Sequence, residues 1–295
     1  MEPSDDHEQE AAGARRLTST VHEFQSARAM LASLAYRLLG SWHDTEDVLQ
    51  EAFVRWSGAD RANVLEPRRY LTRVVTRLAI DVLRTRQARR ESYLGEWLPE
   101  PVPSDPFASV DTSDLSLAVL HLMERLSPPQ RAVYVLRTAF VLPYDDIAEI
   151  LGRSAEDCRQ LHNRAIKALD RDGPRFEPTP AEQRRLLLDF VAAARDGDLA
   201  RLESMLKESV TEWSDGGGQR RVARKPVVGR EQVATFFSRI YSRKDVKVVP
   251  LELVTGPALD VRLPTFRHVL HLEFDGNQIA AVRIQANPTK LSALG

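Results

Sequence analysis

The most concentrated chemistry in this sequence is a run of arginines between residues 68 and 90. Eight arginines stand there against the single acid Asp81, so the run carries a net charge of +7. Clustered guanidinium groups neutralise phosphates, pair with them in a bidentate geometry and stack on exposed bases. Surface helices usually mix charges of both signs. We therefore interpret this run as a nucleic-acid-binding surface, with a solvated charged face as the alternative.

A second group of polar side chains follows the pattern of a helix-turn-helix. A short helix over residues 144–151 ends at Gly152, and a second helix begins after Ser154. This second helix presents side chains that suit base edges and phosphates: Ser154, Arg159, Gln160, Asn163 and Arg164. Because Glu156 and Asp157 dilute its positive charge, we expect weak binding that needs a second DNA-contacting domain. A plain helical hairpin is the alternative.

A third group is acidic and lies on the helix that precedes the arginine run. Its polar residues stand opposite an apolar stripe and are Asp44, Glu46, Asp47, Gln50 and Glu51. A catalytic carboxylate pair is conceivable, but no histidine completes the pattern. A solvated face or a protein-binding face fits these residues better.

The C-terminal part offers two short polar segments, residues 215–219 and 287–291, which read Asp-Gly-Gly-Gly-Gln and Asn-Pro-Thr-Lys-Leu. Three successive glycines permit backbone conformations with positive φ. No Lys-Ser or Lys-Thr pair follows them, so a phosphate-binding loop is not expected. We predict that both segments are contact loops.

Metal chemistry finds little support in the sequence. His268 and His271 would lie on opposite faces of a strand, and Cys158 is the only cysteine. We therefore predict no metal, no cofactor and no disulfide. A further hypothesis is a small-molecule pocket in the C-terminal part, with Asp260 or His268 as acid or base. Its lining would be Trp213, Phe236, Phe237 and Phe266.

These groups belong to a chain of 295 residues with 41 Lys and Arg, 42 Asp and Glu, and a formal charge of −1. A hydrophobic content of 43% suffices for ordinary cores. No apolar run approaches the ~18 residues of a membrane span, and the acidic N-terminus lacks the basic start of a signal peptide. We expect a cytoplasmic protein of two or three domains with no membrane partner.

Five segments follow from patterning. We predict a disordered acidic tail over residues 1–17 and a helical domain over 18–92 that carries the acidic and arginine-rich helices. Residues 93–113 form an acidic, proline-rich linker with Trp97 as an anchor, and a second helical domain over 114–172 holds the helix-turn-helix. Residues 181–292 form an α+β domain.

Within the α+β domain the period of the apolar residues changes twice. Helices are predicted over 181–195, 199–206 and 229–241, and strands near 247–249, 267–274 and 279–284. Asp275-Gly276-Asn277 between the last two strands is a hairpin turn signal.

Four motifs, in this order and spacing, resemble those of bacterial extracytoplasmic-function sigma factors. They are DTEDVLQEAF (residues 44–53), LAIDVLR (78–84), ERLSPPQR (124–131) and DIAEILG (146–152), and the similarity covers about residues 20 to 170. The linker sequence Trp-Leu-Pro-Glu-Pro at 97–101 and the two C-terminal loops resemble the subgroup with a fused SnoaL-like domain. The resemblance implies two all-α sigma domains followed by an α+β, cone-shaped SnoaL-like domain.

The resemblance also implies a role for each motif, in a protein that is not an enzyme. The helix with Asp47, Gln50 and Glu51 is expected to bind core RNA polymerase, whose clamp helices on the largest subunit and flap are the expected partners. The remaining matches are expected to bind promoter DNA: Arg77, Asp81 and Arg84 at the −10 element, and Arg159, Gln160, Asn163 and Arg164 at the −35 element. The linker is expected to thread the polymerase cleft.

The SnoaL-like domain of the subgroup is thought to regulate the sigma factor in place of a separate anti-sigma protein. The resemblance makes these the inter-domain regulatory residues: Trp97, Asp215, Gly216, Gly217, Gly218, Asn287, Pro288 and Lys290. Gln219 and Thr289 depart from the Lys and Asp common at these positions, and the basic run at 220–225 could substitute. The alternative is a ligand-binding or isomerase-like module that responds to an unknown small-molecule effector.

Overall fold

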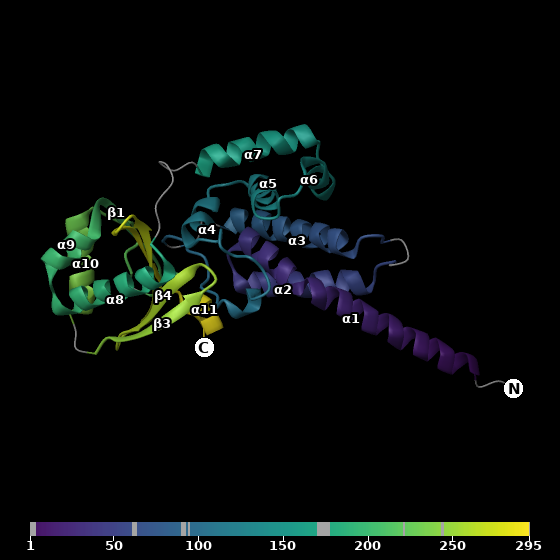
Figure 1. Ribbon diagram of the computed structural model, residues 1–295, viewed down its shortest axis with the longest axis horizontal. Helices are drawn as coiled ribbons and strands as arrows, with labels where there is room; N and C mark the ends of the chain where they lie inside the picture. Colours follow the sequence, from purple (N-terminus) through teal and green to yellow (C-terminus); the bar gives the residue numbers. More distant parts are fainter. Residues whose placement is uncertain are drawn as a thin grey trace. The chain divides into compact units, whose positions relative to one another are not determined.

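The computed structural model describes residues 4–60, 64–89, 93, 95–169, 178–220, 222–242 and 245–294 (Figure 1). The chain divides into two compact units. One consists of Met1–Arg86, Asp105–Asp114 and Arg125–Ala168, and is helical. The other consists of Gln87–Ser104, Leu115–Glu124 and Leu169–Gly295, and contains the sheet.

Three helices open the helical unit. Helices α1 (Ser4–Leu39) and α2 (Trp42–Ser57) form a hairpin that turns at Gly40, whose φ is 61°, and α3 is Pro67–Arg89. Ser41 caps α2, because its side chain accepts a hydrogen bond from the backbone N–H of Asp44. The apolar positions at helical spacing are buried, among them Leu31, Leu34, Leu38, Val48, Ala52, Trp56, Leu71, Val75 and Ala79.

The N-terminal prediction differs from the structure. Helix α1 begins at Ser4, so a disordered tail over residues 1–17 was wrong for residues 4–17, while residues 1–3 lie outside the described part. The segment is rich in Ala, Glu, Gln and Arg, which favour helix. It continues the helix that carries the buried residues Thr20 and Phe24.

The helix-turn-helix follows the predicted pattern. Helix α5 (Pro128–Thr138) is followed by α6 (Tyr144–Leu151) and α7 (Ala155–Leu169). Gly152 ends α6 in the left-handed conformation, with φ 63°, where a residue with a Cβ would be strained. Ile147 and Ile150 of α6 and Cys158 and Ala165 of α7 are buried, so the charged faces of both helices point outward.

The linker divides between the two units. Residues 105–107 form the 3-10 helix η3, and Phe107 packs against Tyr36 and Trp42, with ring centroids 5.8 and 5.5 Å apart. Residues 93–104 and helix α4 (Leu117–Met123) belong to the unit with the sheet. Helix α4 was predicted as the start of the second helical domain, and its His121 ring lies edge-on to Trp213, with 5.7 Å between the centroids.

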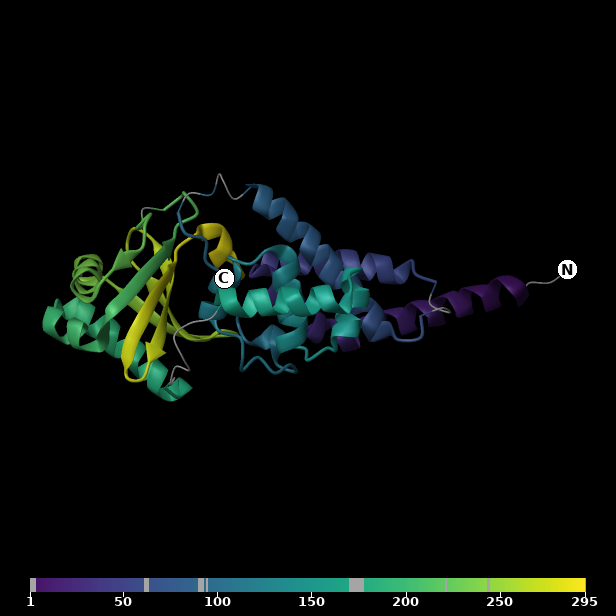
Figure 2. The same cartoon turned by 90° about the horizontal axis from the view of Figure 1, so that it is seen from above.

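The C-terminal domain places helices on one face of a six-stranded sheet (Figure 2). Its elements are α8 (Pro180–Asp196), α9 (Leu199–Met205), β1 (Leu206–Asp215), β2 (Val227–Val228), α10 (Arg230–Tyr241), β3 (Lys247–Leu253), β4 (Gly256–Arg262), β5 (Arg267–Asp275), β6 (Gln278–Gln285), α11 (Pro288–Leu291) and η4 (Ser292–Leu294). The strand order is β2-β1-β6-β5-β4-β3, and β1 and β6 pair in parallel while the other neighbours are antiparallel. Strands β1, β2 and β4 were not predicted.

The two faces of this sheet have different chemistry. Alternate residues such as Val210, Leu270 and Val282 enter a core shared with Phe190 of α8 and Phe237 of α10. The opposite face carries Trp213, Asp215, Arg283 and Gln285, of which Asp215, Arg283 and Gln285 are buried. This second face receives the linker.

Candidate nucleic-acid interface and linker-binding site

Helix α3 carries a row of charged side chains along one face. Arg69, Arg73, Arg77 and Asp81 recur every four residues, opposite the buried residues Leu71, Val75 and Ala79. Arg84 extends the row and lies 3.2 Å from the Asp81 carboxylate. Helix α3 thus brings together the three predicted −10 residues Arg77, Asp81 and Arg84.

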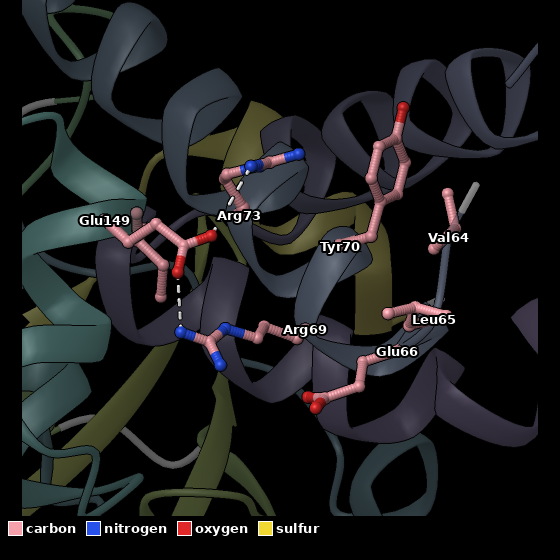
Figure 3. A pocket seen from close by; sticks show the side chains of 8 residues that line it. Val64, Leu65, Glu66, Arg69, Tyr70, Arg73 and Glu149 are labelled. Carbon is pink, nitrogen blue, oxygen red and sulfur yellow. Dashed lines mark hydrogen bonds and ion pairs between the residues drawn. The ribbon is translucent and has the colours of Figure 1, made fainter. Parts of the chain in front are cut away.

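Part of this face pairs with helix α6 (Figure 3). The Arg69 guanidinium lies 2.8 Å from the Asp146 carboxylate and 2.6 Å from that of Glu149, and Arg73 lies 3.7 Å from Glu149. Arg77 Nε donates to the backbone carbonyl of Ile150 at 2.9 Å. These arginines must therefore give up their contacts with α6 before all of their donors can bind phosphates.

A cavity of about 350 Å³ borders these ion pairs. Figure 3 shows it lined by Arg69, Arg73 and Glu149 together with Tyr70 and the loop before α3. The Arg73 guanidinium lies over the half-buried Tyr70 ring, 5.5 Å from the ring centroid. The cavity combines an aromatic surface with cations, which suits an unstacked base beside its phosphate.

Helix α7 exposes all the side chains predicted to read the −35 element. Arg159, Gln160, Asn163 and Arg164 are exposed. The hydroxyl of Ser154 accepts a hydrogen bond from the Asp157 backbone N–H at 3.0 Å, so this residue caps the helix. Arg159 and Gln160 each approach the Glu156 carboxylate at 3.3 Å.

Helix α2 presents the predicted polymerase-binding residues on its outer face. Asp47, Gln50 and Glu51 are exposed, and the neighbouring Val54 side chain is 64% exposed. Glu51 pairs with Arg55 at 2.8 Å along the same helix. Acidic groups around an exposed apolar side chain are typical of a protein-binding face.

A buried carboxylate, Asp215 at the end of β1, organises the linker-binding site. Five groups donate to it: the Tyr93 hydroxyl at 2.6 Å, the Leu98 backbone N–H at 3.0 Å, the Gly217 backbone N–H at 3.0 Å, Lys290 Nζ at 2.6 Å and Gln285 Nε2 at 3.3 Å. Burial, then the Asp215 carboxylate, raises the pKa of Tyr93, so this phenol stays protonated and donates. Residues up to 197 positions apart thus converge on a single side chain.

Lys290, in α11, joins the linker to this carboxylate. Its ammonium group also donates to the Leu98 carbonyl at 2.6 Å and lies 4.0 Å from the centroid of the Trp97 ring. The Asn287 side chain donates to the Tyr93 hydroxyl at 3.2 Å, and Gln285 Nε2 donates to the carbonyl of Leu98 at 3.1 Å. The linker backbone is therefore held by the C-terminal domain.

The glycine loop allows this close approach. Gly217 and Gly218 have φ of 59° and 72°, and a Cβ on Gly217 would lie 2.4 Å from the Asn287 amide nitrogen. Pro288 begins α11, and Asn287 caps it by accepting from the Thr289 backbone N–H. The structure therefore brings together the predicted regulatory residues Trp97, Asp215, Asn287 and Lys290, while Gly216, Gly217, Gly218 and Pro288 shape the backbone around them.

Several linker contacts were not foreseen. Tyr93 and Gln285 had no predicted role here, and Leu98, not Trp97, is the fully buried anchor, at 0% exposure. Gln219 and Arg220 are exposed, and the cation that meets Asp215 is Lys290 rather than the basic run. Arg221 of that run lies outside the described residues.

The residues predicted to line a pocket in the C-terminal domain do not surround one cavity. Phe237 is buried in the core with α8, whereas Trp213 is on the opposite face of the sheet, beside Arg283. Although burial acts to raise the pKa of Asp260, hydrogen bonds from Arg267 and Arg262 hold it below its ordinary value.

His268 is fully buried, with Nε2 2.6 Å from the Tyr241 hydroxyl. Burial lowers the pKa of His268 to about 3. It is therefore neutral at physiological pH. Among the described residues, no group of three or more His, Cys, Asp or Glu side chains could hold a metal ion.

Comparison with known proteins identifies the family. The chain matches Sigma-70 region 2 over residues 24–89 and Sigma-70 region 4 over residues 116–169. It is 39% identical over 231 residues to the ECF RNA polymerase sigma factor SigJ of Mycobacterium tuberculosis, and the alignment covers 76% of this chain and 73% of SigJ. This chain belongs to the ECF RNA polymerase sigma factors.

Further relatives extend the match to the C-terminal domain. The probable ECF sigma factor SigI of Mycobacterium tuberculosis is 31% identical over 280 residues, which are 92% of this chain and 94% of SigI. The crystal structure of SigJ has a TM-score of 0.75 and 30% identity, and covers 92% of this chain and 98% of that chain. The predicted order, helical sigma regions followed by an α+β domain, is confirmed.

Family membership establishes the general activity. As an ECF sigma factor, this protein binds core RNA polymerase and promoter DNA and initiates transcription. Within the described residues, no helix is both long enough and apolar enough to cross a membrane.

Proposed function

We propose that this sigma factor reads its promoters through the exposed faces of α3 and α7, and that its C-terminal domain controls it by holding the linker. The observation that carries the proposal is the placement of the predicted DNA-binding residues on two outward faces of a sigma-type helical unit. Arg77 and Arg84 lie on one face, and Arg159 and Arg164 lie on the other.

At the −10 element, Arg77 and Arg84 neutralise phosphates while Asp81 orients Arg84. Melting a base out of the duplex costs a few kcal/mol, which contacts to the extruded base and its phosphate offset. At the −35 element, Arg159, Gln160, Asn163 and Arg164 supply the donors and acceptors that distinguish base pairs in the major groove. Ser154 contributes mainly by capping the recognition helix.

Core polymerase binds the outer face of α2. Asp47, Gln50 and Glu51 surround the exposed Val54, and we assign this face to the clamp helices of the largest subunit. Region 4 docks on the flap, and the protein works in the cytoplasm. Charge reversal of Glu51 should lower holoenzyme formation more than promoter binding by the isolated sigma factor.

Regulation acts through the linker. The backbone N–H and C=O of Leu98 are occupied by Asp215 and Lys290, so the same segment cannot thread the polymerase cleft while it is docked. Release of the linker from the C-terminal domain thus precedes or accompanies holoenzyme assembly. The domain takes the place of a separate anti-sigma protein.

Reconstituted transcription tests both parts of the proposal. Purified protein and core polymerase are supplied with fragmented genomic DNA, and the transcripts are sequenced to define the promoters. Arg77→Ala should reduce initiation at all of them, with Arg195→Ala, an exposed residue of α8, as the matched control. Promoter choice that survives substitution of both Arg77 and Arg159 would refute the assignment of the two faces.

The regulatory part is tested with Lys290→Met and with removal of residues 287–295. Both remove the ammonium group that joins Asp215 to the linker. We expect each to change the yield of transcripts from the same promoters. Yields equal to wild type for both variants would contradict control by the linker.

One observation favours a small-molecule effector as a second input. A cavity of about 250 Å³ adjoins α11 and is lined by Arg220, Arg267, Ala286, Pro288, Leu291 and Ser292. The exposed Arg220 guanidinium suits an anionic molecule, while Arg267 pairs with Asp260 at 2.9 Å. Thermal unfolding with a panel of phosphorylated and carboxylated metabolites, compared between wild type and Arg220→Ala, tests this site; a panel without any stabilisation argues against it.

A further inference from the structure

Tyr144, the first residue of α6, lies between two arginines from the neighbouring helices. The Arg137 guanidinium of α5 is 5.0 Å from the centroid of the Tyr144 ring, and that of Arg159 in α7 is 5.4 Å away. Both distances are within the ~6 Å range of a cation–π contact. Arg137 is also anchored by a hydrogen bond to the Leu142 carbonyl at 2.9 Å.

The hydroxyl of Tyr144 reaches the recognition helix at a second point. It lies 2.9 Å from His162 Nδ1, and His162 Nε2 lies 3.4 Å from the Thr138 hydroxyl. Burial and then the charge of Arg137 lower the pKa of His162, which favours the neutral ring. One tautomer satisfies both contacts, because Tyr144 donates to Nδ1 while Nε2–H donates to Thr138.

These contacts constrain α7 in two ways. The bond to His162 ties α7 to α6 and α5, which fixes its rotation about its own axis. The ring covers one side of the Arg159 guanidinium, while the Glu156 carboxylate meets it at 3.3 Å on the exposed surface. Arg159 is therefore ordered before it meets DNA, although its side chain remains 50% exposed.

We propose that Tyr144 is a positioning residue for promoter recognition: its ring holds Arg159 in the geometry that reads the −35 element, while its hydroxyl stabilises the packing of α7. The proposal rests on the proposed role of Arg159 as a base-reading residue. Tyr144 itself does not need to touch DNA. An arginine that is already ordered loses less conformational freedom on binding, so more of its contact energy appears as discrimination.

The test compares promoters that differ by single base pairs in the −35 element. Holoenzyme is reconstituted with wild type, Arg159→Ala, Tyr144→Leu, Tyr144→Phe and the Tyr144→Leu/Arg159→Ala double variant, and relative binding is measured for every promoter. We expect Tyr144→Leu to lose ~2–5-fold discrimination at the base pair where Arg159→Ala loses it, the factor that a cation–π contact supplies. The double variant should lose no more than Arg159→Ala.

Tyr144→Phe separates the two parts of the side chain. The phenyl ring keeps the stack, so discrimination should stay near wild type, while loss of the bond to His162 should lower the midpoint of thermal unfolding. If Tyr144 had a merely structural role, Tyr144→Leu would weaken binding to all promoters equally. That pattern would overturn the proposal.

Base reading by Arg159 and its positioning by Tyr144 can be tested separately. If Arg159→Ala leaves every promoter unchanged, base reading by Arg159 is wrong and its positioning by Tyr144 falls with it. If Arg159→Ala acts at one base pair and Tyr144→Leu does not, only the positioning role falls.

A measurement on the unmodified chain covers the case in which Tyr144→Leu does not fold. NMR relaxation of the Arg159 Nε–H group is compared with that of Arg164, an exposed arginine of the same helix. We expect Arg159 to be the more ordered of the two. Equal order parameters would overturn the proposal.

Discussion

Substitution of the buried Asp215 by Asn tests the linker-binding site most directly. The two side chains have nearly the same volume, so the perturbation is one of charge and donor pattern. The five groups that point at Asp215 all donate hydrogen bonds, and one of them is the Lys290 ammonium at 2.6 Å. The amide of Asn would turn a donor toward at least one of these donors.

The magnitude follows from the burial of the pair. The Asp215 side chain is 0% exposed and that of Lys290 is 11% exposed. Breaking a buried ion pair by removing one partner costs about 3–5 kcal/mol. We expect most of this cost to fall on docking of the linker, because Leu98, Tyr93 and Lys290 are the groups that lose a partner.

Amide hydrogen exchange supplies the assay. The Leu98 N–H donates directly to Asp215, so its protection reports docking. A loss of about 3 kcal/mol corresponds to a protection factor lower by roughly 100-fold or more. The Leu270 amide, in the centre of β5, shows whether the domain remains folded, and Asp105→Asn changes an exposed carboxylate of the same linker as a control.

Unchanged protection at Leu98 in Asp215→Asn would refute the account of this site. Loss of protection at both Leu98 and Leu270 would mean that the whole domain had opened. Lys290→Gln then isolates docking, because Lys290 belongs to helix α11 and is not part of a strand. Normal protection at Leu98 in that variant would also contradict the reasoning.

Three further predictions concern single residues. Burial raises the pKa of Glu212 from 4.5 to about 7, so the folded state holds a proton that the unfolded chain has lost, and the free energy of unfolding should fall by about 3 kcal/mol as the pH rises from 4.5 to 7. Urea unfolding at pH 4.5 and 7.5 should show that Glu212→Gln removes this pH dependence. The same pH dependence in the variant would refute the role of Glu212. Gly217→Ala places a Cβ 2.4 Å from the Asn287 amide nitrogen at positive φ and should lower the free energy of unfolding by about 1–3 kcal/mol. Gly95→Ala, at φ of 95° but with open space around the residue, should lower it less in the same thermal scan. Glu149→Gln should remove one of the two carboxylates that pair with Arg69 and tighten binding of the free protein to promoter duplex by ~1.5–5-fold, the worth of an exposed ion pair. Fluorescence anisotropy that shows no gain would contradict competition between this carboxylate and phosphate.

Sequence reasoning was most successful where local rules decide the outcome. Capping and the 3.6-residue period predict the helix-turn-helix, the end of α6 at Gly152 and the outward face of α7. Both depend on neighbours a few residues away. The exposed arginine row of α3 follows in the same way. The predicted disordered tail was wrong because composition alone does not show at which residue a helix begins.

Strands and long-range contacts needed the tertiary structure. Strand β1 carries Glu212 and Ser214 on its inner face and Trp213 and Asp215 on its outer face, so no clean apolar alternation marks it. The pocket hypothesis failed for the same reason, because Trp213 and Phe237 lie on opposite sides of this sheet.

By itself, the sequence determined the family, the order of the domains and the residues that face outward on each helix, because short motifs and helical periodicity are local properties. Only the tertiary structure decided what those residues meet. Asp215 and Lys290 are 75 positions apart, and Asp146 and Arg69 are 77 apart, so their pairing depends on how sheet and helices bring distant segments together. The partner of a charge is set by packing, which no single segment of sequence contains.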